Sequence, residues 1–270
     1  MEKLINKINN ILDDVYPEKL NLKELENNTF FIWKKKYFSY YLKPVKNPFL
    51  VKFDDLLCMD NLKKNIYDNT LQFLNGYRAN NVLLWGEKGC GKSSLVKSLV
   101  PLFDNFKLKL IEVGKEDFYS LEELIELLTG LSYKFIIFLD DVSFVEEDKN
   151  FKTLKAILDG SLVEYSDNYV IYATSNRRHF IKESFEDNDE IHIFESISEK
   201  ISLSDRFGIS WGFYKPDKES YLKIAKHYSV KFGLKKYFTE ESALQFALGK
   251  GGFSGRAAYQ YAVSLFKNKI

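Results

Sequence analysis

The chain has 270 residues, and apolar residues make up 45% of it, which is enough to bury a sizeable core and argues against wholesale disorder. With 39 basic and 38 acidic side chains, its formal net charge is +1, so any contact with nucleic acid must come from a local patch. The two cysteines, Cys58 and Cys90, do not suggest a disulfide framework, and no apolar run has membrane-spanning length. We therefore expect a cytoplasmic protein without a membrane segment.

Residues 1–75 have a mainly helical pattern. Apolar residues recur at helical spacing in residues 5–12 and again in residues 59–74. Between them lies the segment TFFIWKKKYFSYYLKPV, residues 29–45, which is rich in aromatics and lysine. Packing of its aromatics inside an N-terminal helical region is the expected interpretation, because aromatics are ordinary core anchors. A surface for nucleic acid or a partner is the alternative, since bases stack on aromatics and lysine meets phosphate.

Five apolar runs follow from Asn81, separated by helical patterns. They cover residues 81–85, 106–113, 133–141, 168–176 and 207–214. Strands without polar alternation, separated by helices, predict a parallel sheet that is covered on both faces. We therefore expect a three-layer α/β core with a five-stranded parallel sheet.

One of the intervening helices carries recognisable start and stop signals. Ser120 and Glu123 have the spacing of a capping box, and Gly130 lies at the expected stop. Tyr119, just before the cap, is expected to pack against Leu124 as a hydrophobic staple. The alternative is that Tyr119 belongs to an aromatic pore loop, as in threading motors.

After Pro216 the pattern is purely helical, over residues 217–230, 240–248 and 255–267. A small helical lid at the end of the chain is the natural interpretation. The expected organisation is thus an N-terminal helical region (1–75), an α/β core (76–215) and a C-terminal lid (216–270).

The segment Gly86–Ser93 reads GEKGCGKS and matches G-x-x-x-x-G-K-[ST], with an apolar run before it and a helical pattern after it. Glycines in this context let backbone N–H groups wrap phosphates at a helix N-terminus. Lys92 would reach the β- and γ-phosphates, and the Ser93 hydroxyl would be a ligand of Mg²⁺. The expected phosphate-binding residues are Gly86, Glu87, Lys88, Gly89, Cys90, Gly91, Lys92, Ser93 and Ser94.

The third apolar run, FIIFLDD, ends in two carboxylates. Asp140 would hold the metal through its water shell, and Asp141 would orient the attacking water. The alternative, a solvated strand end, is disfavoured because a phosphate-binding loop already predicts an acidic strand end. Adenine is expected near residues 56–59, and it is favoured over guanine because the chain has no Asn-Lys-x-Asp motif.

Three later motifs complete a recognisable set. YATSNRRH places Asn176 at the end of the fourth run, SLSDRFG places Arg206 before the fifth, and FSGRAAYQ places Arg256 at the start of the last helix. Together with the acidic strand end, this set resembles the AAA+ P-loop ATPases. LSDRFGISWG is similar to the corresponding segment of bacterial replication initiators, and FLDD resembles the Asp-Asp ending of initiators and helicase loaders. Across nearly its whole length the chain resembles one uncharacterised bacterial AAA+ family, through ANNVLLWGEKGCGKSS, IYATSNRRH and SLSDRFG.

The resemblance implies roles for three side chains. Asn176 would be the sensor-1 residue that positions water or the γ-phosphate, and Arg256 would be the sensor-2 residue that brings the lid onto it. Arg206 would be an arginine finger that reaches the nucleotide of a neighbouring subunit, which implies a homo-oligomer. An ion pair of Arg206 with Asp205 within the chain is the alternative.

Other features stay open at this point. Cys90 is a redox-sensitive position or a small tolerated side chain, and Arg177 and Arg178 are phosphate contacts or solvated loop residues. The acidic stretch in residues 182–200 is a flexible connection or a site for a basic partner.

The expected function is hydrolysis of Mg-ATP by an oligomeric switch or remodeller whose client, a protein or a nucleic acid, is unspecified. An ATP-gated protein associated with nucleic acid, like a helicase loader, is the alternative. A small-molecule kinase is less favoured, because it leaves the two arginines without a shared purpose.

Overall fold

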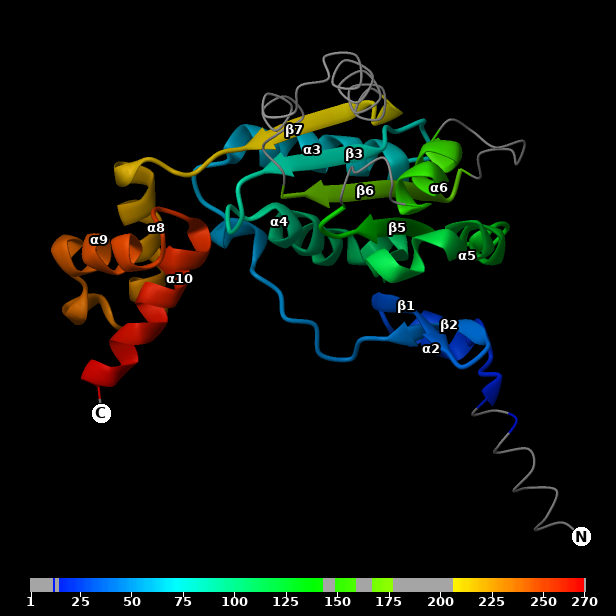
Figure 1. The fold of residues 1–270 in the computed structure, drawn as a ribbon, viewed down its shortest axis with the longest axis horizontal. Coiled ribbons are helices and arrows are strands. Elements are labelled where there is room, and N and C mark those ends of the chain that lie inside the picture. Colours follow the sequence, from blue (N-terminus) through cyan, green and yellow to red (C-terminus); the bar gives the residue numbers. More distant parts are fainter. Residues whose placement is uncertain (1–11, 13–14, 143–148, 159–166, 177–205, 270) are drawn as a thin grey trace, which may run out of the picture.

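The structure is a computed structural model that describes residues 12, 15–142, 149–158, 167–176 and 206–269. Its centre is a seven-stranded sheet in the order β2-β1-β4-β5-β6-β3-β7 (Figure 1). All neighbouring strands run parallel except β1 and β2, which are antiparallel. The strands are β1 (Phe30–Lys36), β2 (Ser39–Pro44), β3 (Val82–Gly86), β4 (Leu108–Val113), β5 (Lys134–Leu139), β6 (Tyr169–Ser175) and β7 (Ile209–Phe213).

Helices cover both faces of the sheet. Alternate side chains of each strand point to opposite faces, so Ile136 and Phe138 belong to one buried cluster and Phe135 and Ile137 to the other. The first cluster includes residues of α3 (Asp60–Leu74), α4 (Lys92–Leu99) and the 3₁₀ segment η2 (Val100–Phe106). The second includes residues of α2 (Leu22–Asn27), the 3₁₀ segment η3 (Lys115–Ser120), α5 (Leu121–Leu128) and α6 (Lys149–Leu158). The three-layer α/β prediction is confirmed.

The predicted number of strands is wrong. The five expected runs form β3 to β7, and the sheet gains β1 and β2 from the segment that was expected to be helical. That segment has period-2 burial: Trp33, Tyr40 and Leu42 point into the core, whereas Lys34 and Lys43 are exposed. The alternation fits a half-buried strand pair, and it was obscured by the run of three lysines. The expected helix at residues 5–12 lies almost wholly outside the described residues.

The start of α5 also differs from the prediction. Ser120 precedes the helix, but its Oγ donates to the backbone oxygen of Asp117 at 2.7 Å and accepts from Nε1 of Trp33 at 2.8 Å. It makes no side-chain capping bond, so the capping-box prediction is wrong: the hydroxyl satisfies the buried indole of β1 instead. Tyr119 is 55% exposed, with its ring edge against Tyr40.

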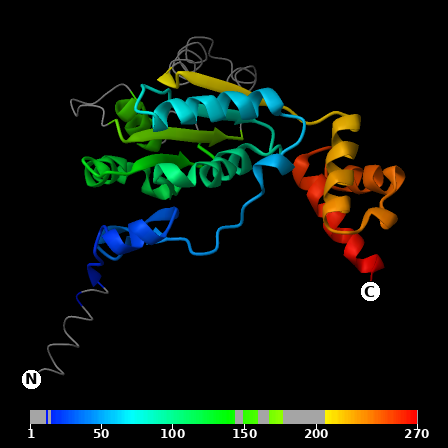
Figure 2. The ribbon, with the colours of Figure 1, turned by 180° about the vertical axis from the view of Figure 1, so that it is seen from behind.

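The lid follows β7 directly and consists of α8 (Lys218–Lys231), α9 (Glu240–Gly249) and α10 (Gly255–Ser264), close to the expected ranges. The side chains of Asp217, Thr239 and Ser254 cap these helices. The short 3₁₀ segments η5 (Lys235–Tyr237) and η6 (Leu265–Asn268) complete it. Seen from behind, the lid lies at one end of the core, away from the β1–β2 hairpin (Figure 2). None of the helices in the described ranges is long and apolar enough to cross a membrane.

Candidate functional site

Three glycines with positive φ shape the turn between β3 and α4. Gly86, Gly89 and Gly91 have φ values of +124°, +77° and +97°, which L side chains rarely adopt. At Gly86 a Cβ would also lie 2.1 Å from the backbone oxygen of Phe213 on β7, so no larger residue fits. The glycines let the backbone bend around the amino end of α4, where N–H groups without helical partners and the helix dipole favour an anion.

Lys92, the first residue of α4, is only 4% exposed. Its Nζ donates to the backbone oxygens of Gly86 at 2.9 Å and Glu87 at 2.8 Å, and to Oδ1 of Asn176 at 2.9 Å. These three acceptors are uncharged, so they satisfy the donors without neutralising the ammonium. Burial lowers the pKa of Lys92, against the opposing effect of Cys90 and nearby carboxylates. An anionic group at Nζ would offset the cost of burying this charge.

Asp140 follows β5 and accepts two hydrogen bonds from hydroxyl groups. Ser93 Oγ and Thr174 Oγ1 each donate to Oδ1 of Asp140 at 2.6 Å. Hydroxyl and carboxylate oxygens are the hard ligands that Mg²⁺ prefers, and this ion takes its remaining ligands from water and phosphate. The donor set therefore fits a magnesium ion held by Ser93 and Asp140.

Asp141 has a φ of +58°, a left-handed conformation that costs a non-glycine residue about 1–3 kcal/mol. Its N–H donates to Thr174 Oγ1 at 2.9 Å, which fixes the strained backbone. Its carboxylate accepts from Nδ2 of Asn176 at 2.5 Å and forms an ion pair with Lys115 Nζ at 3.1 Å. Oδ1 of Asn176 also accepts a hydrogen bond from Nζ of Lys92. The side-chain amide of Asn176 therefore links the ends of β5 and β6 to the first turn of α4.

These groups line a pocket of about 780 Å³ between the core and the lid. One wall is the turn and the strand ends, a second is residues 55–59 before α3, and the third is the lid with Arg256 and Tyr259. The lid also touches the turn directly, because the N–H of Arg256 donates to the backbone oxygen of Gly89 at 3.0 Å. Elements that precede the β3–α4 turn in the chain and elements that follow it therefore both contribute walls of the pocket.

The structure brings most of the predicted site residues together. Lys88 to Ser94, Asp140, Asp141, Asn176 and Arg256 all line the pocket, and Gly86 and Glu87 contribute the carbonyl oxygens that hold Lys92. Arg206 is half-buried just before β7 and is absent from the described pocket lining. Arg177, Arg178, Asp205 and the acidic stretch lie outside the described residues.

Sequence reasoning missed two groups that contact the predicted carboxylates. Thr174 bridges Asp140 and the backbone of Asp141, and its position two residues before Asn176 was the available signal. Lys115 comes from the loop after β4, and nothing in the local pattern distinguishes it from a solvated lysine.

Comparison with known families covers almost the whole chain. A family model described as "Protein of unknown function (DUF815)" matches residues 26–269. The chain belongs to the DUF815 family. No curated protein matches this DUF815 chain at a significant level.

Solved structures show the fold of the DUF815 chain. A variant of RuvB from Thermotoga maritima matches with a TM-score of 0.50 at 15% identity, over 78% of this chain and 63% of that one. The ORC1 protein from Aeropyrum pernix, solved in complex with DNA, matches with a TM-score of 0.50 at 14% identity, over 81% and 64%. This chain thus spans less than two thirds of the length of either relative. At these identities the similarity shows the fold alone, which is the expected P-loop AAA+ fold.

Proposed function

We propose that the pocket binds Mg-ATP and that the chain hydrolyses it as an oligomeric switch or remodeller. The observation that carries this proposal is Lys92, a buried ammonium at the wall of a large pocket, whose three hydrogen-bond acceptors in the described part of the chain are neutral oxygens. A triphosphate would place negative charge in direct contact with this ammonium, and the N–H groups at the amino end of α4 add further donors.

The phosphate end of the nucleotide would meet residues from four elements. Lys92 would contact the β- and γ-phosphates, while Ser93 and Asp140 would hold the metal. When bound, Mg²⁺ would neutralise part of the charge that develops on the phosphate oxygens. Asp141 is the proposed residue that orients the attacking water and accepts its proton, and its ion pair with Lys115 Nζ at 3.1 Å holds the carboxylate in place.

Two further donors would act on the γ-phosphate. Asn176 contacts both Lys92 and Asp141, so its amide can orient water between the ammonium and the carboxylate. Arg256 lines the pocket from the lid and would add a positive charge from a second body, which couples lid closure to catalysis.

The base would lie against residues 55–59. Leu56 is buried, and Met59 lies close to the turn: a Cβ on Gly91 would approach Met59 Cε to 3.2 Å. Apolar side chains next to the phosphate turn provide a surface for a purine ring, and adenine is the proposed base because the guanine-reading motif is missing from the sequence.

Calorimetric titration with ATP and Mg²⁺ tests the proposal. We expect wild-type protein to bind, and Lys92→Ala to weaken binding by about 10- to 150-fold, because a hydrogen bond to a charged group contributes about 1.5–3 kcal/mol. Lys64→Ala, an exposed lysine on α3, is the matched control and should bind like wild type. A folded wild-type sample that gives no heat with either ATP or GTP would contradict the proposal.

A second candidate function is ATP-gated association with DNA. Two observations favour it: the similar ORC1 structure is a DNA complex, and residues 28–53 of this chain contain six lysines and no aspartate or glutamate. Retention of single-stranded DNA that depends on salt and on ATP would support this function.

A further inference from the structure

The positive charge of this nearly neutral chain is unevenly distributed. Residues 28–53 contain six lysines and no aspartate or glutamate, whereas the whole chain has a net charge of only +1. These residues form β1, β2 and the connection from β2 to η1 (Phe53–Asp55). A local positive field of this kind is the electrostatic footprint expected for a polyanion.

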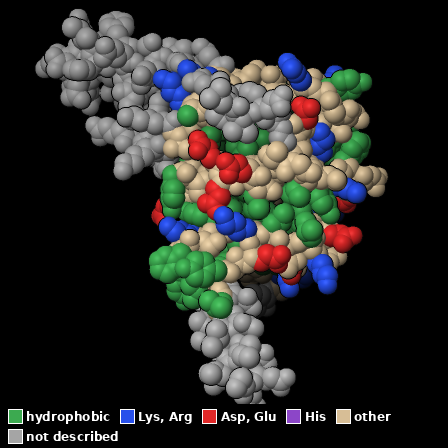
Figure 3. Space-filling view, turned by 90° about the vertical axis from the view of Figure 1, so that its right-hand side faces the viewer, with side chains coloured by type: hydrophobic (Ala, Val, Ile, Leu, Met, Phe, Trp, Pro, Cys, Tyr) green, Lys and Arg blue, Asp and Glu red, His purple; other side chains and the backbone are tan. Residues whose placement is uncertain are grey.

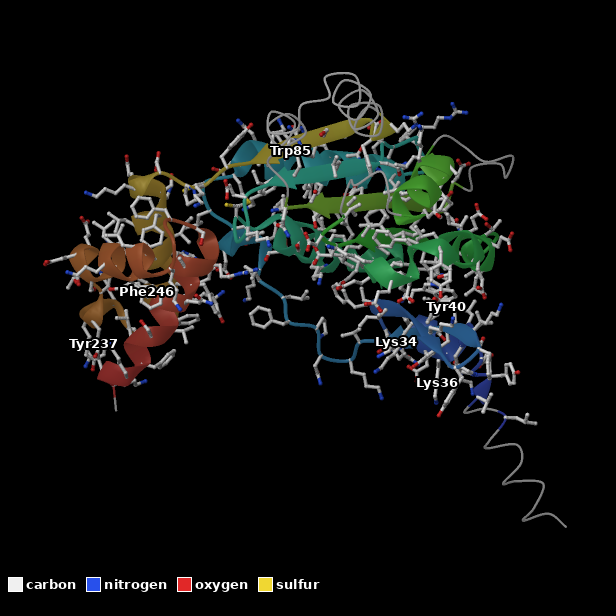
Figure 4. The ribbon with its side chains drawn as sticks, viewed as in Figure 1. Lys34, Lys36, Tyr40, Trp85, Tyr237 and Phe246 are labelled. Atoms are coloured by element: carbon white, nitrogen blue, oxygen red, sulfur yellow. The ribbon has the colours of Figure 1, made fainter. Side chains whose placement is uncertain are left out.

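The β1–β2 pairing places lysines together on the face of the hairpin that points away from its core side. Directly opposite residues of an antiparallel pair share a face, and the register pairs Lys34 with Tyr41 and Ile32 with Lys43. Lys36 follows on the same face, because successive side chains alternate. Lys34 and Lys36 project away from the core, whereas Tyr40 points toward it (Figure 4). We call residues 32, 34, 36, 41 and 43 the outer face.

Aromatic rings lie exposed at the turn of the hairpin. Tyr37 is 61% exposed and has a φ of +49°, and Phe38 is 79% exposed and stacks on Tyr16 with centroids 6.2 Å apart. Hydrophobic side chains gather at the lower end of the molecule, where the hairpin lies (Figure 3). Large rings beside lysines on an exposed turn are costly to leave in water and are suited to stacking on flat partners.

The connection after β2 extends this surface to the nucleotide pocket. It carries exposed Lys46 and Lys52, and Phe49 is exposed and lines the pocket. Glu112 of β4 lies next to Ile32 in the register, but Lys97 neutralises it with an ion pair at 2.7 Å. The outer face and this connection therefore form a basic track that ends at the pocket.

We propose that single-stranded DNA binds along the outer face, with its phosphates on Lys34, Lys36 and Lys43 and its bases on the rings of Tyr37 and Phe38. The choice of DNA rests on the second candidate function above. A single strand fits better than a duplex because stacking on the rings needs unpaired bases. It also fits better than an acidic protein, which would use the lysines but not two adjacent exposed rings.

The core side of the hairpin connects this surface to the carboxylate of Asp141. The hydroxyl of Tyr40 bonds to Asp117 Oδ1 at 2.9 Å and to the hydroxyl of Tyr119 at 2.6 Å, both in η3. The same short helix begins at Lys115, which forms the ion pair with Asp141. Bound DNA that shifts the hairpin would therefore also shift Lys115, the ion-pair partner of Asp141. For this reason we expect bound DNA to change the turnover of ATP.

Fluorescence anisotropy with labelled oligo-dT, without nucleotide, tests the surface. The variant Lys34→Ala with Lys36→Ala should weaken binding and lower the magnitude of the log–log salt slope by about 1.4, since each single-strand phosphate contact contributes about 0.7. Phe38→Ala should weaken binding on the order of tenfold through lost stacking. Lys223→Ala with Lys226→Ala, two exposed lysines of α8, is the control with the same change in net charge.

Each result of the titration decides between the proposal and a rival. Equal binding by the hairpin variant and the α8 variant overturns the surface, as does wild-type protein that does not bind oligo-dT at low salt. If duplex DNA or poly-glutamate binds more tightly than oligo-dT, the proposal of a single-stranded partner is wrong. If oligo-U binds more tightly than oligo-dT, the choice of DNA over RNA is wrong. Lys34→Arg with Lys36→Arg should retain the wild-type salt slope, which shows that charge rather than folding was lost.

Two further variants separate this inference from the proposed ATPase. Lys92→Ala should bind oligo-dT like wild type in the absence of nucleotide, so a failure of ATP binding leaves the surface test intact. Tyr40→Phe removes the bonds to Asp117 and Tyr119 but leaves the outer face unchanged. It should bind DNA normally and lose the effect of DNA on turnover. Tyr40→Phe with an unchanged DNA effect would overturn the coupling through η3.

Discussion

Gly86 provides a test of the backbone geometry at single-residue resolution. Its φ is +124°, and a Cβ there would lie 2.1 Å from the oxygen of Phe213. We predict that Gly86→Ala lowers the free energy of unfolding by more than about 3 kcal/mol, because β7 must move in addition to the strain in the backbone. Urea denaturation followed by circular dichroism measures this change.

Gly130 is the matched control for that substitution. It also has a positive φ, +80°, but a Cβ there would meet nothing within 4 Å. Gly130→Ala should therefore cost only the backbone term, about 1–2 kcal/mol. Equal losses in the two variants would mean that the contact of the turn with β7 contributes nothing.

At the same scale, sequence reasoning identified the residues with a fixed motif and missed those without one. The G-x-x-x-x-G-K-[ST] spacing was enough to predict phosphate-binding roles for Lys92 and Ser93, and both residues line the pocket. Thr174 and Lys115 contact the two carboxylates only because β4, β5 and β6 are neighbours. The order of strands in a sheet is a tertiary property, so the local sequence around Thr174 and Lys115 could not predict these contacts.

At the scale of elements, the buried strands were predictable and the N-terminal hairpin was not. The runs that form β3 to β7 are apolar on both faces, and this pattern has few alternatives in an α/β chain. β2 is an edge strand and β1 is its neighbour, and the outward face of this hairpin is partly solvated. Lysines take four of the thirteen positions in the two strands and weaken the apolar signal. Their inward residues, such as Trp33, find partners in η3, far along the chain.

The contact between η1 and the lid is a second testable element. Asp55 is buried, and its carboxylate accepts from Nε2 of His227 at 2.9 Å and from Nζ of Lys231, both on α8. We predict that Asp55→Asn lowers the free energy of unfolding by about 2 kcal/mol, because it removes two charge-assisted bonds to the lid. Urea denaturation at pH 7 measures the loss. Asp54→Asn, the exposed neighbour in the same 3₁₀ turn, should leave the stability unchanged.

This stabilisation should also depend on pH. Burial alone would raise the pKa of Asp55, but the bonds from Lys231 and His227 outweigh it and the net pKa lies below its ordinary value. A depressed carboxyl pKa stabilises the fold fully above the unfolded value near 3.9, and the effect is lost as the pH falls through the folded value. The difference between wild type and Asp55→Asn should therefore shrink below about pH 4. A difference that grows on acidification would contradict this assignment.

At the scale of the whole molecule, three parts of the chain converge on one pocket. The core provides the turn and the carboxylates, the connection after β2 provides Phe49, and the lid provides Arg256. The lid was predictable because a helical pattern runs from Pro216 onward, and each of its three helices begins at a capping side chain. The route of the connection was not, because residues 45–52 have no periodic pattern and are held by packing against the core.

Arg206 does not line this pocket in the described structure, and its position leads to a prediction about assembly. It stands before β7, at the opposite end of the strand from the lid, and is absent from the described lining of its own pocket. If it acts as a finger, it acts on the nucleotide of a second copy. We predict that Arg206→Ala retains ATP affinity and lowers turnover by about 10³- to 10⁵-fold. Calorimetry and phosphate release, measured over a range of protein concentrations, test both parts.

Mixing two inactive variants distinguishes a finger in trans from a structural role. A Lys92→Ala subunit lacks the phosphate contact but keeps Arg206, whereas an Arg206→Ala subunit has the reverse defect. In a mixed assembly, the intact arginine of the first faces the intact pocket of the second, so turnover should reappear and peak near equal amounts. Arg256→Ala mixed with Lys92→Ala should stay inactive, because Arg256 lines the pocket of its own chain. No recovery in the first mixture, or full turnover by dilute Arg206→Ala alone, would exclude action between subunits.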